Sequence, residues 1–457
     1  MPKSRADTLY RCTDCGAKSH KWVGQCTSCG AWNTLSLATD PGVFPTDLPG
    51  SKPPTRLSDV ITTEYERYQT GLTELDRVLG GGIVPGSVVL LGGEPGIGKS
   101  TLALQALGHL SEEHETLYVS AEESLEQLAL RYQRLGLNRQ ELTALCDGQL
   151  EQLIIELDRK KYSVLVIDSI QTLRAAGLES SPGSVGQVRE CADRLVLEAK
   201  RRGIAIILIG HVTKEGALAG PKTLEHLVDT VLYFEGDTTS RFRLVRAWKN
   251  RFGSVNEVGV FAMAARGLKA VRNPSAIFLS GAQIDSPGTA IFASQEGSRP
   301  MLVEVQALVD QSSLGNPRRL SVGYETHRLN MLLAILHRHA GINLLDQDVF
   351  VNVAGGLRVV ETGADLAVAA ALISSFSNKP IDRGTIFFGE LGLSGEVRPV
   401  PRGEARVAES AKLGFSKLVV PAANKLGSRN ATDGLAVLAL RSAAELNSVV
   451  LEASAQA

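Results

Sequence analysis

One stretch of the chain has the composition and spacing of a nucleotide-binding loop. The pattern G-x-x-x-x-G-K-[ST] is matched by Gly93, Glu94, Pro95, Gly96, Ile97, Gly98, Lys99 and Ser100, with Thr101 next. Glycines let successive backbone N–H groups turn towards phosphate oxygens, and a helix that begins here adds its positive end. Lys99 is expected to neutralise the β- and γ-phosphates, and the Ser100 hydroxyl is expected to bind Mg²⁺. The stretch therefore predicts binding of ATP with Mg²⁺.

Two strand-like segments end in the carboxylates that such a loop needs as partners. Residues 165–167 are apolar and lead into Asp168, which is expected to hold Mg²⁺ through its water shell. Residues 117–120 lead towards Glu122 and Glu123. Because the carboxyl ends of parallel strands share one sheet edge, one of this pair is expected to be the general base. Glu122 is the first candidate for the base, and Glu123 is the alternative. A purely structural interpretation is that both acids only stabilise the N-terminus of a helix.

Four cysteines near the N-terminus have the spacing of a metal site. Cys12 and Cys15 form one C-x-x-C pair, and Cys26 and Cys29 form another, each followed by glycine. In a cytosolic protein this pairing favours a metal over disulfides. Four thiolates around Zn²⁺ make a closed, structural site, with iron or a redox pair as the alternative. A module this small lacks its own core, so the metal would supply its folding energy.

The composition is that of a globular chain with several domains. It has 457 residues, 44% hydrophobic and 21% charged, with a net charge of −1. Any binding of nucleic acid must therefore come from local basic surfaces. The longest apolar runs are too short to span a membrane, and the N-terminus lacks the apolar core of a signal peptide. We expect no membrane partner and a cytoplasmic location.

Four regions follow one another along the chain. They are a zinc ribbon at residues 1–34, a linker rich in Pro and Gly at 35–55, an ATPase domain at 56–280 and a second globular domain at 285–457. In the ATPase domain, apolar strands alternate with amphipathic helices, which predicts an α/β fold with a mostly parallel sheet covered on both faces. The expected strands are 87–92, 116–120, 163–168, 204–210, 229–234 and 242–248.

Several of these motifs together resemble the RadA (Sms) family of bacterial DNA-repair proteins. They are the four-cysteine ribbon, the phosphate loop, the segment Tyr-Val-Ser-Ala-Glu-Glu-Ser at 118–124 and the pentapeptide Lys-Asn-Arg-Phe-Gly at 249–253. The resemblance spans essentially the whole chain, and the pentapeptide is its most specific part. It implies a RecA-like ATPase core in a homo-oligomer, a hexameric ring, whose ATP hydrolysis is stimulated by DNA. It also implies work on single-stranded and branched DNA alongside the recombinase RecA.

The pentapeptide places two cations, Lys249 and Arg251, just after a strand. In RecA-like rings such residues can reach the nucleotide of the neighbouring subunit, as an arginine finger does. Our hypothesis is that one of them completes the active site in trans; a solvated basic turn is the alternative. His211 also follows a strand, residues 206–209, and either senses the γ-phosphate or is purely structural.

The segment from about residue 290 onwards resembles the protease domain of Lon-type ATP-dependent proteases. The supporting stretches include residues 295–300, 361–367 and 392–400. The resemblance implies an α+β Lon protease-like domain and, as an alternative function, ATP-dependent proteolysis. Aligned on this pattern, Asp365 stands at the position of the catalytic serine and Glu404 at that of the lysine. Because a carboxylate cannot replace either group of that pair, we expect the domain to be catalytically inactive.

Four basic residues are candidates for contact with the DNA backbone. They are Arg318 and Arg319 in the C-terminal domain, and Lys214 and Lys222 after His211. Phosphate contact is independent of base sequence and would suit a translocating ring. Ordinary surface cations are the alternative.

A regulatory ATPase or kinase similar to KaiC shares the core and the paired glutamates, but it lacks the zinc ribbon and the Lon-like domain.

Overall fold

The computed structural model shows two compact units, residues 1–63 and 64–457. It describes residues 10–12, 17–19, 21–37, 56, 58, 66–137, 141–178, 180–211, 223–235, 241–279, 286–312, 316–426 and 434–452. Among the helices in these residues, none combines the length and the apolar composition that crossing a bilayer requires.

The first unit contains a small antiparallel sheet in the order β2-β1-β3. Its strands are β1 (Tyr10–Cys12), β2 (Lys18–Ser19) and β3 (Leu35–Leu37). Its buried core includes Cys12, Cys26 and Leu35, which is too little apolar surface to stabilise a fold without help. Backbone hydrogen bonds close the turn from Cys12 N to Ala17 O at 2.9 Å and the turn from Cys26 N to Ala31 O at 2.8 Å.

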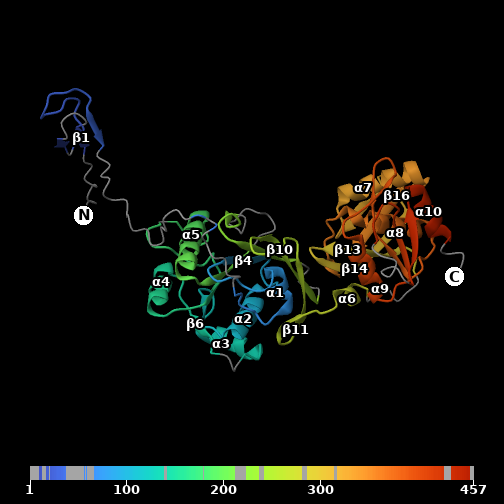
Figure 1. Cartoon of the computed structure of the whole chain (residues 1–457), viewed down its shortest axis with the longest axis horizontal. Helices are drawn as coiled ribbons and strands as arrows, with labels where there is room; N and C mark the ends of the chain where they lie inside the picture. Colours follow the sequence, from blue (N-terminus) through green and yellow to red (C-terminus); the bar gives the residue numbers. More distant parts are fainter. Residues whose placement is uncertain are drawn as a thin grey trace. The chain divides into compact units, whose positions relative to one another are not determined.

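The second unit contains a nine-stranded sheet in the order β12-β11-β10-β9-β4-β8-β7-β5-β6. Its strands are β4 (Val88–Gly93), β5 (Thr116–Ser120), β6 (Thr143–Leu145), β7 (Val164–Asp168), β8 (Ala205–His211), β9 (Thr230–Glu235), β10 (Phe242–Asn250), β11 (Val258–Ala264) and β12 (Gly267–Ala270). Figure 1 labels β4, β6, β10 and β11 of this sheet. From β9 to β6 all neighbours are parallel, and β10 to β12 continue antiparallel. The six predicted strands agree to within two residues, whereas β6, β11 and β12 were not predicted.

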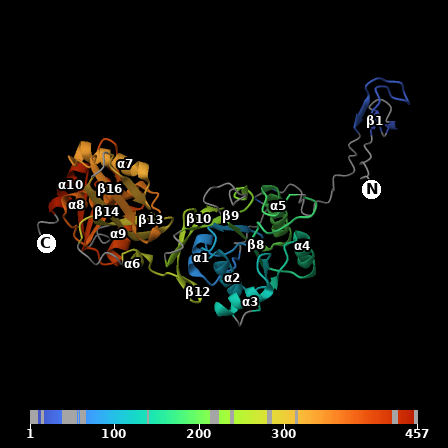
Figure 2. The same ribbon diagram turned by 180° about the vertical axis from the view of Figure 1, so that it is seen from behind.

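Helices cover both faces of this sheet, as the sequence predicts (Figure 2). They are α1 (Thr73–Leu79), α2 (Lys99–Leu110), α3 (Leu125–Arg134), α4 (Leu150–Arg159) and α5 (Val185–Arg202). Side chains alternate along each strand, so Val89 and Leu91 of β4 share a core with α1, α2 and α3. Val88 and Leu90 point the other way and share a core with α4 and α5.

The C-terminal domain is an α+β structure built on a seven-stranded sheet, in the order β15-β16-β14-β13-β17-β20-β21. These strands are β13 (Thr289–Glu296), β14 (Arg299–Gln311), β15 (Arg319–Val322), β16 (Gln347–Val353), β17 (Thr385–Phe387), β20 (Lys417–Pro421) and β21 (Ala436–Leu440). A separate pair is formed by β18 (Glu390–Leu391) and β19 (Val397–Arg398). The helical segments are α6 (Pro274–Phe278), α7 (Thr326–Ile335), η3 (Leu336–Ala340), η4 (Ala354–Gly356), η5 (Thr362–Ala364), α8 (Asp365–Ser377), α9 (Gly403–Lys412) and α10 (Ala443–Glu452).

Helix α8 lies in the middle of this domain because its sequence is apolar on every side. It packs against β13 and β14 within one large core. The same core includes Leu244 of β10 and Val258 and Val260 of β11. The nucleotide-binding sheet and the C-terminal domain therefore share apolar contacts inside the second unit.

Candidate functional site

The phosphate loop lies between β4 and α2, at the carboxyl edge of the parallel strands. Gly98 precedes the first residue of α2 with a φ of +118°, a conformation that strains any residue with a Cβ atom. The loop is supported from behind by Arg243 of β10, which is 4% exposed. Its Nε donates a 3.1 Å hydrogen bond to the backbone oxygen of Ile97. The sequence did not identify Arg243, because its strand lies 146 residues away along the chain.

Lys99 is buried at the base of the loop, as a phosphate-binding lysine requires. Its Nζ donates to the backbone oxygens of Gly93 at 2.9 Å and Glu94 at 2.8 Å. Burial lowers the pKa of Lys99 to about 8, and the nearby carboxylates of Asp168 and Glu122 oppose this shift. The loop thus holds a cation whose desolvation a polyphosphate would offset.

Asp168 ends β7 and lies beside the last residue of β5, Ser120. The buried phenol of Tyr118 donates a 2.5 Å hydrogen bond to Asp168 Oδ2. The next residue, Ser169, donates from its hydroxyl to Glu122 Oε1 at 2.9 Å. The two strand-end acids, Asp168 and Glu122, therefore meet at one edge of the sheet through a serine, as their positions predict.

Only one member of the glutamate pair is directed towards the phosphate loop. Glu123 forms an ion pair with Arg131 of α3. Glu122 lines the cleft of the loop, and its Oε1 lies 3.9 Å from His211 Nε2. Burial and the charge of Lys99 lower the pKa of His211, which favours the neutral imidazole near pH 7. The geometry favours Glu122 over Glu123 as the candidate base.

The loop borders a cleft of about 500 Å³. Its lining consists of Pro95, Gly96, Gly98, Lys99, Ser100, Thr101, Glu122, Arg131, Arg134 and His211. Sequence analysis missed Arg131 and Arg134, although the capping box of Ser124 and Gln127 marks where their helix begins. The volume, the cations and the hydroxyl of Ser100 fit a nucleoside triphosphate, with Ser100 and Asp168 as the residues that would hold Mg²⁺.

The pentapeptide at 249–253 lies at the opposite edge of the same sheet. Asn250 pairs with Thr230, and Thr230 pairs with Val89 near the start of β4. The phosphate loop begins only at Gly93, about 13 Å further along the strand. Lys249 and Arg251 therefore lie at the end of the strands that is away from the phosphate loop of their own chain.

Both cations of the pentapeptide also contact their own chain. Lys249 Nζ donates to the backbone oxygens of Glu225 at 2.6 Å and Val228 at 2.7 Å. Burial and the charge of Arg251 lower the pKa of Lys249. Arg251 lies 3.1 Å from Asp229 and keeps 55% of its side chain exposed. Of the two, Arg251 is the more accessible to a neighbouring molecule.

In the first unit, three of the four expected zinc ligands come together. The sulfur atoms of Cys12, Cys26 and Cys29 all lie within 4.8 Å of one another. The Sγ atoms of Cys12 and Cys29 are 3.7 Å apart, close to the edge of about 3.8 Å that a tetrahedron of thiolates around Zn²⁺ has. Cys15 lies outside the described residues. The three sulfur atoms fit a zinc ion.

In the C-terminal domain, Asp365 is a fully buried carboxylate with several donors. It accepts a 2.7 Å hydrogen bond from the Tyr324 phenol and a 2.9 Å bond from Leu391 N, and it forms an ion pair with Arg328. Burial raises the pKa of Asp365, while the bonds from Arg328 and Tyr324 oppose that shift. Glu404 is exposed in the first turn of α9. The Asp365 carboxylate is thus already committed to bonds within the fold.

The candidate DNA contacts fall into two groups. Arg318 donates to Asp348 Oδ2 at 2.8 Å, and its guanidinium lies 5.8 Å from the centre of the Phe350 ring. Arg319 donates to the Leu345 oxygen at 3.2 Å and is the first residue of β15, an edge strand of its sheet. Lys214 and Lys222 lie outside the described residues.

A parallel sheet with a phosphate loop at its carboxyl edge, acids on the neighbouring strands and antiparallel strands added beyond β9 defines a RecA-like P-loop ATPase. The sequence matches the family described as AAA domain over residues 51–217. It matches the rubredoxin metal binding domain over residues 10–36. Residues 325–424 match the family described as subunit ChlI of Mg-chelatase.

Curated relatives match over nearly the whole chain. The DNA repair protein RadA of Pseudomonas aeruginosa is 54% identical over 442 residues, which cover 96% of this chain and 97% of the relative. The RadA proteins of Escherichia coli and Bacillus subtilis are 49% and 45% identical, and they cover 96% and 97% of this chain and 97% and 98% of their own lengths. The chain belongs to the RadA family of DNA repair proteins. It is an ATPase with ATP and Mg²⁺ at the phosphate loop and Zn²⁺ in its ribbon.

Proposed function

We propose that this chain is a DNA-dependent ATPase that works as a ring-shaped motor, or helicase, on single-stranded or branched DNA. In this proposal it promotes branch migration in recombination and repair together with RecA. The observation that carries the proposal is the separation of the phosphate loop from Lys249 and Arg251 across one sheet. An active site divided in this way is completed when chains assemble side by side, as in a hexameric ring.

At the phosphate loop, the chain's own residues divide the work of hydrolysis. Lys99 binds the β- and γ-phosphates; Ser100 and Asp168 would hold Mg²⁺, and the ion would supply positive charge beside the phosphates. Glu122 takes a proton from a water molecule, and the oxygen of that water forms a bond to the γ-phosphorus. The bond between that phosphorus and the bridging oxygen breaks, and ADP leaves with the electron pair. His211 senses the γ-phosphate.

Lys249 or Arg251 reaches the nucleotide of the next subunit and stabilises the charge of the transition state. An exchange of the contact with Asp229 for a contact with phosphate would free Arg251 for this role. Alanine at either position is expected to leave ATP binding intact and to lower turnover with DNA. Unchanged turnover in both variants would show that the trans site is wrong.

We place DNA against the C-terminal domain and the segment that follows His211 in the sequence, with Arg318, Arg319, Lys214 and Lys222 as the phosphate contacts. In chain order the proposal has a zinc ribbon at 1–34, which β3 extends to Leu37, a linker that was predicted at 35–55, the ATPase domain at 56–280, and residues 285–457 as an inactive protease-like collar. The buried bonds of Asp365 support this assignment, because that carboxylate offers neither a nucleophile nor a base for proteolysis.

The decisive experiment measures ATP turnover with and without single-stranded DNA, and unwinding of a forked duplex. We expect turnover to rise with DNA and unwinding to need both ATP and Lys99. Mass measurement in solution with nucleotide tests the hexamer, and pull-down of purified RecA tests that partnership. If DNA neither stimulates turnover nor is unwound, the motor function is wrong.

A further inference from the structure

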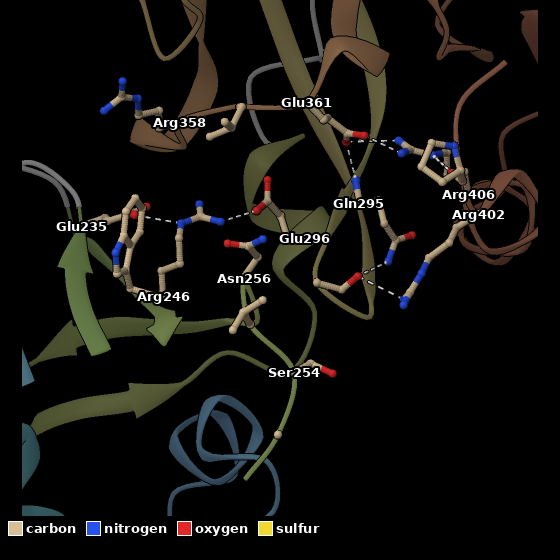
Figure 3. A pocket seen from close by; sticks show the side chains of 16 residues that line it. Glu235, Arg246, Ser254, Asn256, Gln295, Glu296, Arg358, Glu361, Arg402 and Arg406 are labelled. Carbon is tan, nitrogen blue, oxygen red and sulfur yellow. Dashed lines mark hydrogen bonds and ion pairs between the residues drawn. The ribbon is translucent and has the colours of Figure 1, made fainter. Parts of the chain in front are cut away.

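One buried ion pair joins the C-terminal domain to the strand that carries the pentapeptide. Arg246 of β10 lies between two carboxylates, with Nε at 2.8 Å from Glu235 Oε1 and Nη1 at 2.5 Å from Glu296 Oε2 (Figure 3). Glu235 belongs to the neighbouring strand β9, whereas Glu296 ends β13 of the C-terminal domain. The side chains of Arg246 and Glu296 are each only 7% exposed. A pair buried this deeply resists separation, because either partner alone would be an unpaired buried charge.

Strands β13 and β14 form an antiparallel hairpin, and its tip, which begins at Glu296, makes two more bonds to the ATPase domain. Ser298 N donates to Glu257 Oε1 at 2.6 Å, and Arg299 Nη1 lies 2.7 Å from Glu74 Oε2. Gly297, between Glu296 and Ser298, adopts a φ of +57°, and a Cβ atom there would lie 2.8 Å from Glu257. The turn of β13 and β14 is therefore seated closely on the ATPase domain.

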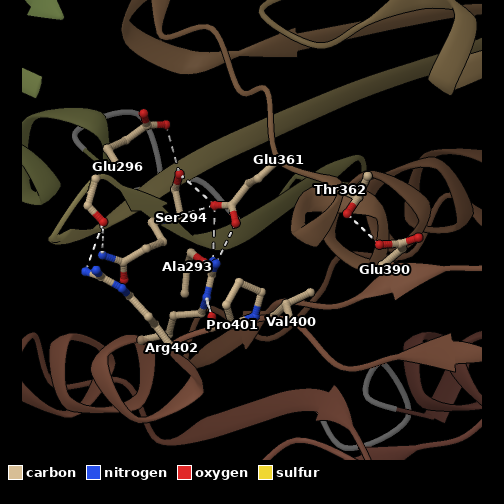
Figure 4. A network of polar contacts seen from close by, with 12 residues as sticks. Ala293, Ser294, Glu296, Glu361, Thr362, Glu390, Val400, Pro401 and Arg402 are labelled. Atoms are coloured by element: carbon tan, nitrogen blue, oxygen red, sulfur yellow. Dashed lines mark hydrogen bonds and ion pairs between the residues drawn. The ribbon is translucent and has the colours of Figure 1, made fainter. Parts of the chain in front are cut away.

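The residues of β13 just before this tip are held as firmly inside the C-terminal domain. Glu361 accepts hydrogen bonds from Ser294 Oγ at 3.2 Å and from Gln295 N at 2.7 Å (Figure 4). Its other oxygen pairs at 2.5 Å with Arg406, whose side chain is fully buried. Because Ser294 and Gln295 directly precede Glu296, the position of the Glu296 carboxylate is set by the C-terminal domain.

Beyond the ion pair, the two domains are separated by a cleft of about 1030 Å³. It is lined by Ser254 and Asn256, which follow the pentapeptide, and by Arg358 and Arg402 on the opposite wall (Figure 3). The C-terminal domain thus acts on this end of β10 through the hairpin tip. Lys249 is only three residues beyond Arg246 on the same strand.

We infer that Glu296 is a positioning residue for ATP hydrolysis, and that its ion pair with Arg246 holds β10 so that Lys249 and Arg251 meet the nucleotide of the next subunit. This inference rests on the proposed trans site. It gives the C-terminal domain a direct part in ATP turnover, in addition to any contact with DNA.

Two variants of the full chain disturb the tip in different ways. Glu296→Gln removes the charge and leaves Arg246 paired with Glu235; Gly297→Ala displaces the tip without a change of charge. Both are expected to lower kcat by up to about 10²-fold, the effect of a misplacement of about 1 Å, while the Kd for a non-hydrolysable ATP analogue stays the same. Arg358→Gln, which removes a charge from the same cleft, is the matched control and should keep full turnover. Unchanged kcat in Gly297→Ala and in folded Glu296→Gln would overturn the inference.

Mixed assemblies separate this role from a merely structural one. Lys99→Ala chains lack a working phosphate loop but keep the hairpin tip unchanged. Glu296→Gln chains keep the phosphate loop but have an altered hairpin tip. We expect an equimolar mixture to turn over ATP faster than the sum of the two separate preparations. Turnover equal to that sum would show that Glu296 does not act across the subunit boundary.

A reference mixture distinguishes failure of the inference from failure of the proposed function. It combines Lys99→Ala chains with chains that carry both Lys249→Ala and Arg251→Ala. If this mixture also gives only the sum, the trans site is wrong and the role of Glu296 falls with it. If it exceeds the sum and the Glu296→Gln mixture does not, only the role of Glu296 is wrong.

Discussion

The phenol of Tyr118 donates a 2.5 Å hydrogen bond to Asp168, the carboxylate placed to hold Mg²⁺. Burial and the charge of Asp168 raise the pKa of Tyr118 well above its usual value, so the phenol remains a donor. Tyr118→Phe is expected to raise the Mg²⁺ concentration for half-maximal ATP turnover about tenfold, because the carboxylate loses the bond that orients it. A Mg²⁺ titration checks this. Tyr162→Phe, which loses a similar bond to Glu156, is the control and should not shift the titration.

Glu122 and Glu123 are expected to differ sharply when each is changed to glutamine. Glu122→Gln should lower single-turnover hydrolysis by about 10²- to 10⁴-fold, because it removes the general base, while ATP affinity is kept. Glu123→Gln breaks the ion pair with Arg131, which lines the cleft, so it should mainly raise KM. The reverse ranking of the two variants in single-turnover experiments would transfer the role of base to Glu123.

The sequence was sufficient for the parts of this site that lie on contiguous segments. The phosphate loop, Asp168 and the paired glutamates each follow an apolar strand, and parallel pairing brings strand ends together regardless of loop length. Arg243 and Tyr118 could not be predicted in the same way. Their roles depend on which strands become neighbours, and a buried arginine or tyrosine in a strand carries no local pattern. The tip of β13 and β14 escaped prediction for the same reason, since its partners lie 41 to 225 residues away.

Binding of ATP should depend on pH through Lys99. Its pKa is lowered to about 8 by burial, and a bound polyphosphate raises it again. Below about 8 the lysine is charged in both states and affinity is constant; above it, binding requires uptake of a proton. The Kd of a non-hydrolysable analogue should therefore rise by up to about tenfold for each pH unit above about 8. Lys99→Arg keeps its charge and should lose this dependence, whatever its affinity. A flat profile for the unmodified chain would contradict the prediction.

Restoring a serine at Asp365 should damage the fold and yield no protease. Asp365→Ser leaves Arg328 without its buried partner, a loss of about 3–5 kcal/mol in the free energy of unfolding. Glu404→Lys alters an exposed side chain and should change that free energy by about 0.5 kcal/mol or less. Thermal melts and a casein digestion assay on the single and double variants check both statements. Casein cleavage by the double variant would contradict the prediction that a serine and a lysine at these positions yield no protease.

Zinc should be needed by the ribbon and dispensable for the fold of residues 64–457, because the two belong to separate compact units. Cys26→Ser is expected to lose about one zinc ion per chain and to unfold the ribbon. The main thermal transition should stay where it is, and Cys146→Ser, at an exposed position, is the control that should keep its zinc. A large shift of the main transition in Cys26→Ser would show that the ribbon stabilises the ATPase domain.

The two groups of residues in the proposed reaction lie at opposite ends of the strands of the nine-stranded sheet. The phosphate loop lies at one end, and Lys249 and Arg251 lie at the other. Under the trans arrangement, a single chain can bind ATP but cannot hydrolyse it. Dilution then becomes a switch: as neighbours dissociate, nucleotide stays bound while hydrolysis stops. At a low concentration of this protein the separate chains would not hydrolyse ATP. Hydrolysis would begin only where the chains assemble.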